Sequence, residues 1–199
     1  MLYQKEREEL CLVAKTMWDR NMTNAAGGNI AVRVNDQHLI MTPTQMSEQK
    51  FCDLTPWEIL VVDYDLNVIE GDGKPTREIN MHMGVLKNFP GVNCVFHAHA
   101  PNSLVFAGAE KDMPTYYEAT KKLGDSIKCL PYGKACTQEL ADRVLDYYKE
   151  QGNVPNERSV AVLLAQHGML VSDKSLKAAY NMIERVEANA YVAIHANQI

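Results

Sequence analysis

Residues 92–99 read Val-Asn-Cys-Val-Phe-His-Ala-His, a short apolar run that ends in two histidines. The run predicts a buried strand, and side chains two residues apart on a strand point to the same face of its sheet. His97 and His99 can therefore reach one ion. His167 follows a second apolar run, residues 160–165, in the sequence Gln-His-Gly. A fold that joins these strand ends would give three imidazoles to a tetrahedral zinc site with one open position.

Glu78 is the candidate acid or base beside this site. It lies in Pro-Thr-Arg-Glu, where a helix is expected to begin just before the first of the two strands. A zinc ion held by neutral nitrogens keeps its double charge and acts as a Lewis acid, so a nearby carboxylate can move protons. The competing interpretation is that these histidines are hydrogen-bonded core residues. The remaining histidines are predicted to be structural or solvated, and they are His38, His82 and His195.

Composition narrows the classes of protein to which the chain can belong. Its 199 residues predict a single domain over 1–199, large enough to form a core without disulfides. A net charge of -5 without a Lys/Arg cluster argues against a nucleic-acid partner. No apolar stretch has the length of a membrane span, and the charged N-terminus differs from a signal peptide. Five scattered cysteines predict reduced thiols and a cytoplasmic location.

Apolar periodicity and turn residues predict helices that alternate with short strands. Helices are expected at 3–20, 76–88, from about 101, at 116–123 and 137–150, and from 173 or 175 onward. Strands are expected at 30–34, 38–42, 59–63, 92–99, 160–164 and 169–171, and residues 151–156 are expected to be a surface loop. Short strands joined by tight turns favour an antiparallel or mixed sheet with helices on its faces.

Five motifs occur in order along the chain: Gly27-Gly28-Asn29-Ile30 with Arg33, Thr42-Pro43-Thr44, Lys74-Pro75-Thr76-Arg77-Glu78, His97-Ala98-His99 and Gln166-His167-Gly168. Together they resemble the class II aldolase/adducin family, and within it the aldolases that cleave L-fuculose 1-phosphate. The resemblance runs from the first predicted helix to the last. It implies an α/β fold, namely a three-layer α/β/α sandwich around a mostly antiparallel central sheet. It also implies zinc, a homotetramer with four-fold symmetry and an active site at a subunit interface.

The resemblance also implies roles for single residues. Glu78 would contact the metal in the resting enzyme and act as acid and base in turnover. Tyr117, or Tyr116 in a slightly shifted alignment, would come from a neighbouring subunit and serve the departing aldehyde; ordinary packing is the alternative for either tyrosine. The glycine turn could equally be a hairpin turn without a ligand. The remaining implied assignments are the metal ligands His97, His99 and His167 and the phosphate contacts Gly28, Asn29, Thr44, Thr76 and Arg77.

Three departures from the family pattern bear on the substrate. Gln45 stands where the phosphate loop often has glycine, and Thr76 and Arg77 stand where two serines often precede the acid. Arginine can clamp a phosphate or receive a carboxylate. The sequence ends at Ile199, whereas the fuculose-phosphate aldolases carry a further tail with a tyrosine that reaches the active site. These departures leave the identity of the sugar open, whereas the implied metal chemistry does not depend on them.

The leading functional hypothesis is a zinc-dependent carbon–carbon lyase. It would cleave a keto-sugar 1-phosphate, such as L-fuculose 1-phosphate, into dihydroxyacetone phosphate and an aldehyde, with Mn²⁺, Co²⁺ or Fe²⁺ as substitute metals. Alternatives of the same fold are a pentulose-5-phosphate 4-epimerase, which usually has aspartate at position 78, and a sugar-acid phosphate decarboxylase, which Arg77 keeps open. A thio-sugar phosphate dehydratase also stays open. An adducin-like binding module would be expected to lack the three histidines.

Overall fold

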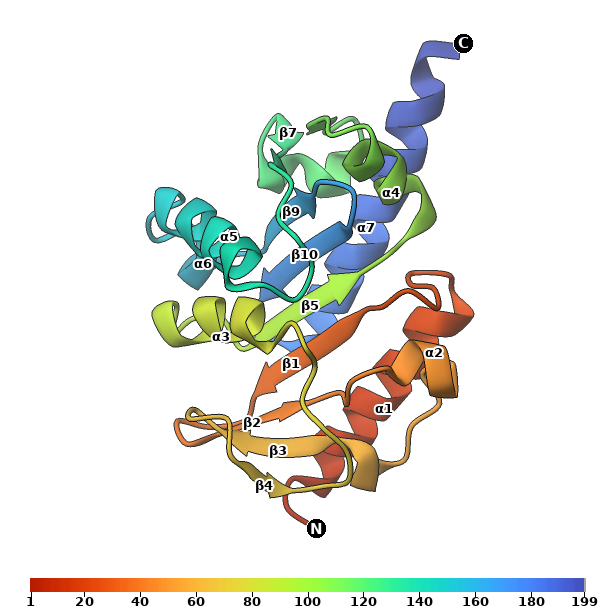
Figure 1. The fold of residues 1–199 in the computed structure, drawn as a ribbon. Helices are drawn as coiled ribbons and strands as arrows, with labels where there is room; N and C mark the ends of the chain where they lie inside the picture. Colours follow the sequence, from red (N-terminus) through yellow and green to blue (C-terminus); the bar gives the residue numbers. More distant parts are fainter. Residues whose placement is uncertain (199) are drawn as a thin grey trace.

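Short apolar runs build a central sheet of eight strands. In sheet order these are β4 (Val68–Glu70), β3 (Leu60–Asp63), β2 (His38–Met41), β1 (Asn29–Arg33), β5 (Cys94–Ala98), β10 (Gly168–Asp173), β9 (Val160–Leu164) and β8 (Cys129–Leu130). Neighbouring strands are antiparallel, except for the parallel pair β8 and β9. The computed structural model describes residues 1–198 (Figure 1). A separate two-stranded ribbon joins β6 (Met113–Pro114) to β7 (Ser126–Ile127).

Helices cover both faces of the sheet. They are α1 (Gln4–Asp19), α2 (Met46–Lys50), α3 (Ile79–Asn88), α4 (Pro101–Gly108), α5 (Gln138–Glu150), α6 (Val154–Glu157) and α7 (Leu176–His195), with 3-10 turns at Pro56–Glu58, Glu118–Leu123 and Ala196–Gln198. In Figure 1, α3, α5 and α6 lie in front of the sheet, and α1 and α7 lie behind it. None of the described helices combines the length and apolar character needed to cross a membrane.

Alternation along β5 divides the apolar core into two layers. Phe96 packs into a cluster with α1, α4 and α7, whereas its neighbour Val95 packs into a cluster with α3 and α5. Both residues are fully buried, as expected for a central strand with helices on both faces. The three-layer α/β/α sandwich with a mostly antiparallel sheet is therefore confirmed.

The predicted helices and strands form close to their expected positions, although the helix expected at 116–123 is a 3-10 turn over Glu118–Leu123. Helix α3 begins at Ile79 rather than at Thr76, and Glu78 occupies the position before its first residue. The Thr76 hydroxyl accepts a hydrogen bond from the Glu78 backbone N–H at 3.3 Å, so Thr76 closes the turn that leads into the helix. The expected surface loop at 151–156 contains part of the short helix α6.

Strand register brings distant parts of the chain to one place. On one side of β5, Asn29 of β1 pairs with His97. On its other side, Leu170 of β10 pairs with the same histidine. The beginning of β1, the end of β5 and the β9–β10 turn therefore lie at the same end of these neighbouring central strands.

Candidate metal centre

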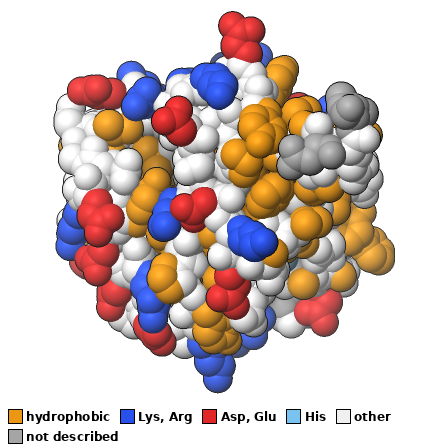
Figure 2. Space-filling model, turned by 90° about the horizontal axis from the view of Figure 1, so that it is seen from above, with side chains coloured by type: hydrophobic (Ala, Val, Ile, Leu, Met, Phe, Trp, Pro, Cys, Tyr) orange, Lys and Arg blue, Asp and Glu red, His pale blue; other side chains and the backbone are white. Residues whose placement is uncertain are grey.

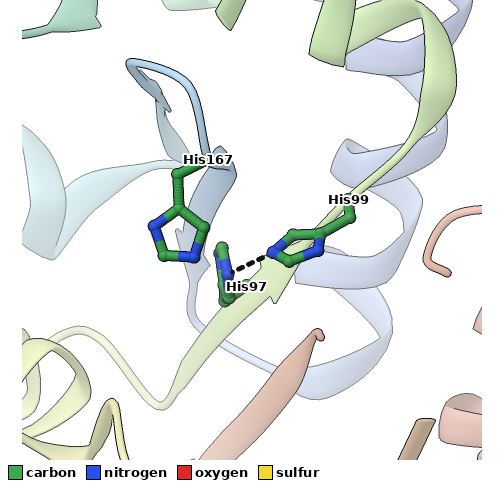
Figure 3. A group of neighbouring side chains, drawn as sticks. All are labelled: His97, His99 and His167. Atoms are coloured by element: carbon green, nitrogen blue, oxygen red, sulfur yellow. Dashed lines mark hydrogen bonds between the residues drawn. The ribbon is translucent and has the colours of Figure 1, made fainter. Parts of the chain in front are cut away.

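Three histidines converge where the end of β5 meets the β9–β10 hairpin (Figure 3). His97 lies within β5, His99 follows its last residue, and His167 lies in the turn between β9 and β10. One nitrogen of each ring lies within 4.8 Å of the others, and His99 Nε2 is 2.8 Å from His97 Nε2. The structure thus brings together all three predicted ligands.

Two glycines make room for the imidazoles. A Cβ atom at Gly168 would lie 2.6 Å from the Ala98 carbonyl oxygen and 2.7 Å from His99 Cδ2. A Cβ atom at Gly27 would lie 2.7 Å from His99 Cε1. Contacts this short require the backbone or the ring to move, and rigid surroundings make that movement costly. Glycine at 27 and 168 is therefore part of how the chain builds the centre.

Hydrogen bonding and burial keep the rings in the form that binds metals. His97 Nδ1 lies 2.9 Å from the Met169 carbonyl oxygen, which can only accept, so Nδ1 carries the hydrogen and Nε2 is free to coordinate. Burial lowers the pKa of His97. Burial, together with the neighbouring rings of His97 and His167, lowers the pKa of His99 to about 2. Neutral imidazole is the protonation state that a divalent metal requires.

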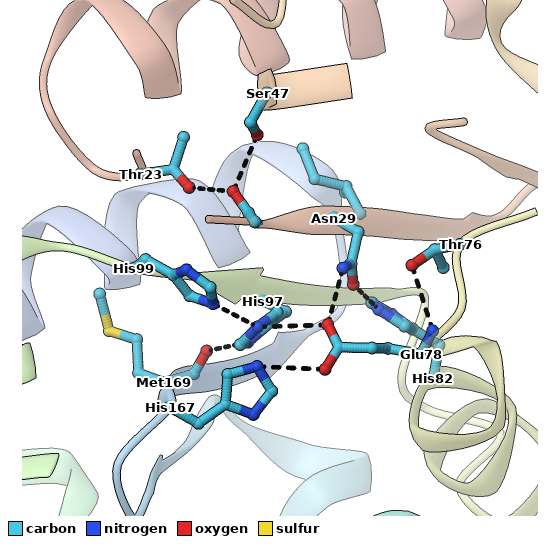
Figure 4. Close-up of polar contacts among 12 residues, drawn as sticks. Thr23, Asn29, Ser47, Thr76, Glu78, His82, His97, His99, His167 and Met169 are labelled. Carbon is cyan, nitrogen blue, oxygen red and sulfur yellow. Dashed lines mark hydrogen bonds and ion pairs between the residues drawn. The ribbon is translucent and has the colours of Figure 1, made fainter. Parts of the chain in front are cut away.

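Glu78 faces the three rings from the N-terminal end of α3 (Figure 4). Its Oε2 lies 3.4 Å from His97 Nε2, and its Oε1 lies 3.1 Å from His167 Nε2. Asn29 Nδ2 donates a hydrogen bond to Oε2 at 2.9 Å. Burial alone would raise the pKa of this carboxyl, but the two facing imidazoles and the Asn29 amide outweigh it and hold the pKa well below its usual range.

The donor set fits a divalent cation. Glu78 is 8% exposed, and its Oε1 accepts no hydrogen bond from the described residues although it faces His167. A buried anionic oxygen of this kind is costly unless it is compensated, and a cation beside it provides that compensation. Three imidazoles and one carboxylate match the ligands that zinc, manganese, cobalt and iron accept. The residues that would hold the ion are His97, His99, His167 and Glu78.

A cleft opens from the carboxylate side of the centre. It has a volume of about 520 Å³, including its open mouth. All five predicted phosphate contacts line it, and so do Glu78 and His167. The cleft also has a wall that the sequence did not predict, formed by the loop before α5. The lining residues of the cleft are Ala26, Gly27, Gly28, Asn29, Pro43, Thr44, Gln45, Thr76, Arg77, Glu78, Ala135, Cys136 and His167.

Two hydroxyl hydrogen bonds hold the glycine turn at the cleft in place. Thr23 and Ser47 both donate hydroxyl hydrogen bonds to the Gly27 carbonyl oxygen (Figure 4). Gly28 has a φ of 103°, and a Cβ atom there would lie 2.5 Å from Thr23 Oγ1. Gln45 also adopts the left-handed region, with a φ of 61°. The chain therefore keeps a glycine-like backbone conformation at position 45 while carrying a side chain there.

Tyr117 lies away from the centre of its own chain. It is 43% exposed, and it is absent from the described residues that line the cleft. The Asn189 side-chain oxygen of α7 accepts hydrogen bonds from the backbone N–H groups of Tyr116 and Tyr117. Hydrophobic side chains gather on the surface at this end of the molecule (Figure 2). The exposed hydrophobic residues on α4, on the segment before Glu118–Leu123 and on α7 are Val105, Tyr116, Tyr117, Tyr191 and Val192.

Comparisons with known proteins agree with this geometry. The sequence pattern of the class II aldolase and adducin N-terminal domain family matches residues 8–194. The chain is 28% identical to 5-deoxy-D-ribulose 1-phosphate aldolase of Bacillus thuringiensis, over 100% of this chain and 89% of the relative. It is 27% identical to 3-oxo-tetronate 4-phosphate decarboxylase of Escherichia coli, over 94% and 85% of the two chains.

Solved structures extend the agreement to three dimensions. The structure of an L-fuculose 1-phosphate aldolase superposes with a TM-score of 0.83 at 27% identity, covering 96% of this chain and 86% of that one. The family is metal-dependent, and the three histidines described above are placed so that they could hold a metal ion in this chain. The chain therefore belongs to the class II aldolase and adducin N-terminal domain family.

Proposed function

We propose that the chain is a zinc-dependent aldolase that cleaves a ketose 1-phosphate into dihydroxyacetone phosphate and an aldehyde. One observation carries the proposal: the Glu78 carboxylate lies 3.1 to 3.4 Å from two of three converging imidazoles and opens onto a cleft. The relatives named as aldolases of 5-deoxyribulose 1-phosphate and fuculose phosphate support the same substrate class. The names that print a 5-deoxy sugar favour a substrate that lacks a hydroxyl group at the end opposite its phosphate.

The chemistry divides between the metal and Glu78. When bound, a divalent metal supplies Lewis-acid stabilisation of the negative charge that develops on the substrate oxygens as the carbon–carbon bond breaks. The carbon next to the carbonyl loses its bonding partner in this step and must take up a proton. Glu78 is the only carboxylate lining the cleft among the described residues. It is ionised at rest, so it would first take up the proton released when the substrate hydroxyl becomes the aldehyde oxygen, and then pass a proton to this carbon. No lysine of the described chain lines the cleft, so a Schiff-base route has no nucleophile there.

The outer half of the cleft binds the phosphate in this proposal. Gly28, Asn29, Thr44 and Thr76 lie in its wall, and Arg77 adds a full positive charge. The Thr44 backbone N–H donates to the Lys74 carbonyl oxygen at 2.9 Å, so Thr44 would contribute its hydroxyl group. The Asn29 side chain bonds to Glu78 and His82, so Asn29 would contribute only its backbone. Oriented amides and a guanidinium together are a strong phosphate-binding combination. Placing the phosphate at this rim sets the substrate carbonyl between Arg77 and the histidines.

Tyr117 completes the site from a neighbouring subunit of a homotetramer. Its exposure and the apolar surface around it support an interface at this end of the molecule. The phenol would exchange the proton of the hydroxyl group that becomes the aldehyde oxygen. Light scattering should give the mass of four chains, whereas a monomer at micromolar concentration would contradict the interface. Mixed tetramers of His97→Ala and Tyr117→Phe chains should regain activity that neither variant has alone.

A decarboxylase is the second candidate, because Arg77 could equally receive a substrate carboxylate and one relative is named as a decarboxylase. The deciding experiment incubates zinc-loaded protein with ketose 1-phosphates, pentulose 5-phosphates and 3-oxo sugar-acid phosphates, and identifies the products by mass spectrometry. Dihydroxyacetone phosphate with an aldehyde supports the aldolase. Release of carbon dioxide, or an epimer without cleavage products, would assign the site to the alternative reaction.

A further inference from the structure

A buried chain of hydrogen bonds supports Glu78 from behind. His82 lies on α3, one helical turn after Glu78, and is fully buried. Its Nε2 lies 2.5 Å from Asn29 Oδ1, and Asn29 Nδ2 donates to Glu78 Oε2 at 2.9 Å (Figure 4). Asn29, the first residue of β1, thus links His82 of α3 to the Glu78 carboxylate.

The chemistry of the three groups fixes the direction of every hydrogen bond. The ionised carboxylate can only accept, so the Asn29 atom beside it must be the amide nitrogen. The amide oxygen of Asn29 then faces His82, and an amide oxygen can only accept as well. His82 Nε2 must therefore carry a hydrogen. Burial lowers the pKa of His82 to about 4, so the ring is neutral at neutral pH and this hydrogen reflects a choice of tautomer.

We propose that His82 is a positioning residue for Glu78: its Nε2–H holds the Asn29 amide in the orientation that donates to Glu78 Oε2. The inference rests on the proposed role of Glu78 as acid and base. Asn29 holds Oε2 in place and leaves Oε1 without a hydrogen bond from the described residues. Oε1 lies 3.1 Å from His167 Nε2, so holding Oε2 also fixes how Oε1 faces the histidines. Without the His82 donor, the Asn29 amide can rotate by half a turn and place its oxygen beside the Glu78 carboxylate. The two oxygens then repel each other.

Substitution at His82 separates positioning from packing. His82→Leu removes the donor and keeps a similar volume, and kcat should fall about 10- to 100-fold with KM within about threefold of wild type. His82→Gln retains an N–H group at the end of its side chain and should recover kcat to within about threefold of wild type. The matched control is Val85→Ala, a buried substitution on the same helix. It should lower the melting temperature and leave kcat near wild type.

Two outcomes of these kinetics would overturn the inference. One is a fall of kcat in Val85→Ala as large as that in His82→Leu, because packing would then explain both. The other is loss of metal from His82→Leu in proportion to its activity, because His82 would then act on the metal centre rather than on Glu78. Metal content measured by elemental analysis should instead stay equal among wild type, His82→Leu and His82→Gln.

The tautomer can be observed without any assay of activity. NMR of protein labelled with ¹⁵N in histidine distinguishes Nε2–H from Nδ1–H rings, and the His82→Gln spectrum identifies the signal by its loss. The inference requires the Nε2–H tautomer in the zinc-loaded protein at neutral pH. An Nδ1–H ring would overturn it, whatever reaction the protein catalyses. Absence of any cleavage product with the ketose phosphates, beside an Nε2–H ring, would instead refute the proposed function and leave the hydrogen-bond chain in place.

Discussion

The metal centre and the rim of the cleft adjoin each other and are built in different ways. In the centre, His97 and His99 are 0% and 5% exposed, and strand pairing on both sides of β5 sets their positions. At the rim, Gln45, Arg77 and Cys136 lie on loops and are largely open to solvent. Strand register tolerates little change, whereas loops accept new side chains without cost to the core. The difference suggests that the centre preserves the chemistry while the rim selects the substrate.

Backbone conformation makes the same distinction. Gln45 and Cys136 at the rim have φ values of 61° and 64°, which residues with a Cβ seldom adopt. In the centre, the close approaches to His97 and His99 are made by Gly168, which has no Cβ. Gln166, directly before His167, also has a φ of 59°, so side chains at positions that favour glycine occur in both regions. What distinguishes the centre is that it uses glycine where the contact with a histidine ring is closest. The following predictions test this contrast, from the largest expected effect to the smallest.

His97→Ala should cause the largest loss. It removes a buried ligand, so we expect loss of most bound metal and a fall in turnover of at least about 10³-fold, because catalysis depends on the ion. The fold should persist, since a core of this size does not depend on a metal. Elemental analysis and circular dichroism measure the two effects. His38→Ala is the matched control, since His38 bonds to the Tyr3 hydroxyl away from the centre. Full metal content in His97→Ala would refute the ligand assignment.

Glu78→Gln should retain the metal and lose turnover. Three histidines suffice to hold an ion, while removal of a general acid/base costs about 10²- to 10⁴-fold in kcat. KM should change much less, because the phosphate is bound at the rim. A direct measurement is exchange of the proton next to the carbonyl of dihydroxyacetone phosphate in heavy water, followed by NMR. Exchange as fast as in wild type would show that Glu78 is not the base.

The sequence predicted the centre better than the rim for a physical reason. His97 and His99 lie two residues apart on an apolar strand, and this local pattern reports a shared face. The position of β5 between β1 and β10 depends on long-range pairing, which local periodicity cannot show. The family resemblance implied a mostly antiparallel sheet but no strand order. His167 was grouped with the other two histidines from its own apolar run and Gln-His-Gly motif, and the resemblance then implied the same ligand set. The motifs thus predicted all three ligands but not the hydrogen bonds behind them.

Short elements and unpatterned loops escaped prediction. The helix α2 and the strands β4 and β8 have five residues or fewer, which is too short for a period to appear. Ala135 and Cys136 reach the cleft from a loop that contains no recognisable motif. His82 was expected to be structural or solvated. Its contact with Asn29 arises because the fold places α3 beside the start of β1. These residues become neighbours through tertiary structure alone.

Arg77→Ala should have an intermediate effect that is confined to binding. Arg77 lines the cleft and forms no ion pair with any other residue of the described chain, so its charge is available to a substrate anion. A hydrogen bond to a charged group contributes about 1.5 to 3 kcal/mol, so KM should rise about 10- to 100-fold while kcat changes little. Arg77→Lys keeps the charge and should recover part of the loss. An unchanged KM for ketose phosphates would remove Arg77 from the phosphate site.

Gln45→Gly should have the smallest effect. Glycine relieves the left-handed backbone at φ 61°, a gain of about 1 to 2 kcal/mol, but it also loses about 0.5 to 1 kcal/mol to its greater freedom in the unfolded chain. The Gln45 side chain hydrogen-bonds only to exposed groups of Glu48 and Gln49 among the described residues, which adds little. Chemical denaturation should therefore show a change of about 1 kcal/mol or less, and KM should stay within about threefold of wild type. Gln45→Val is the contrasting variant, because a β-branched residue fits this conformation poorly and should both destabilise the protein and raise KM. A tenfold rise of KM in Gln45→Gly alone would mean that the glutamine side chain itself contacts the substrate. The rim would then recognise the substrate through the side chains of both Gln45 and Arg77, and not through the backbone alone at position 45.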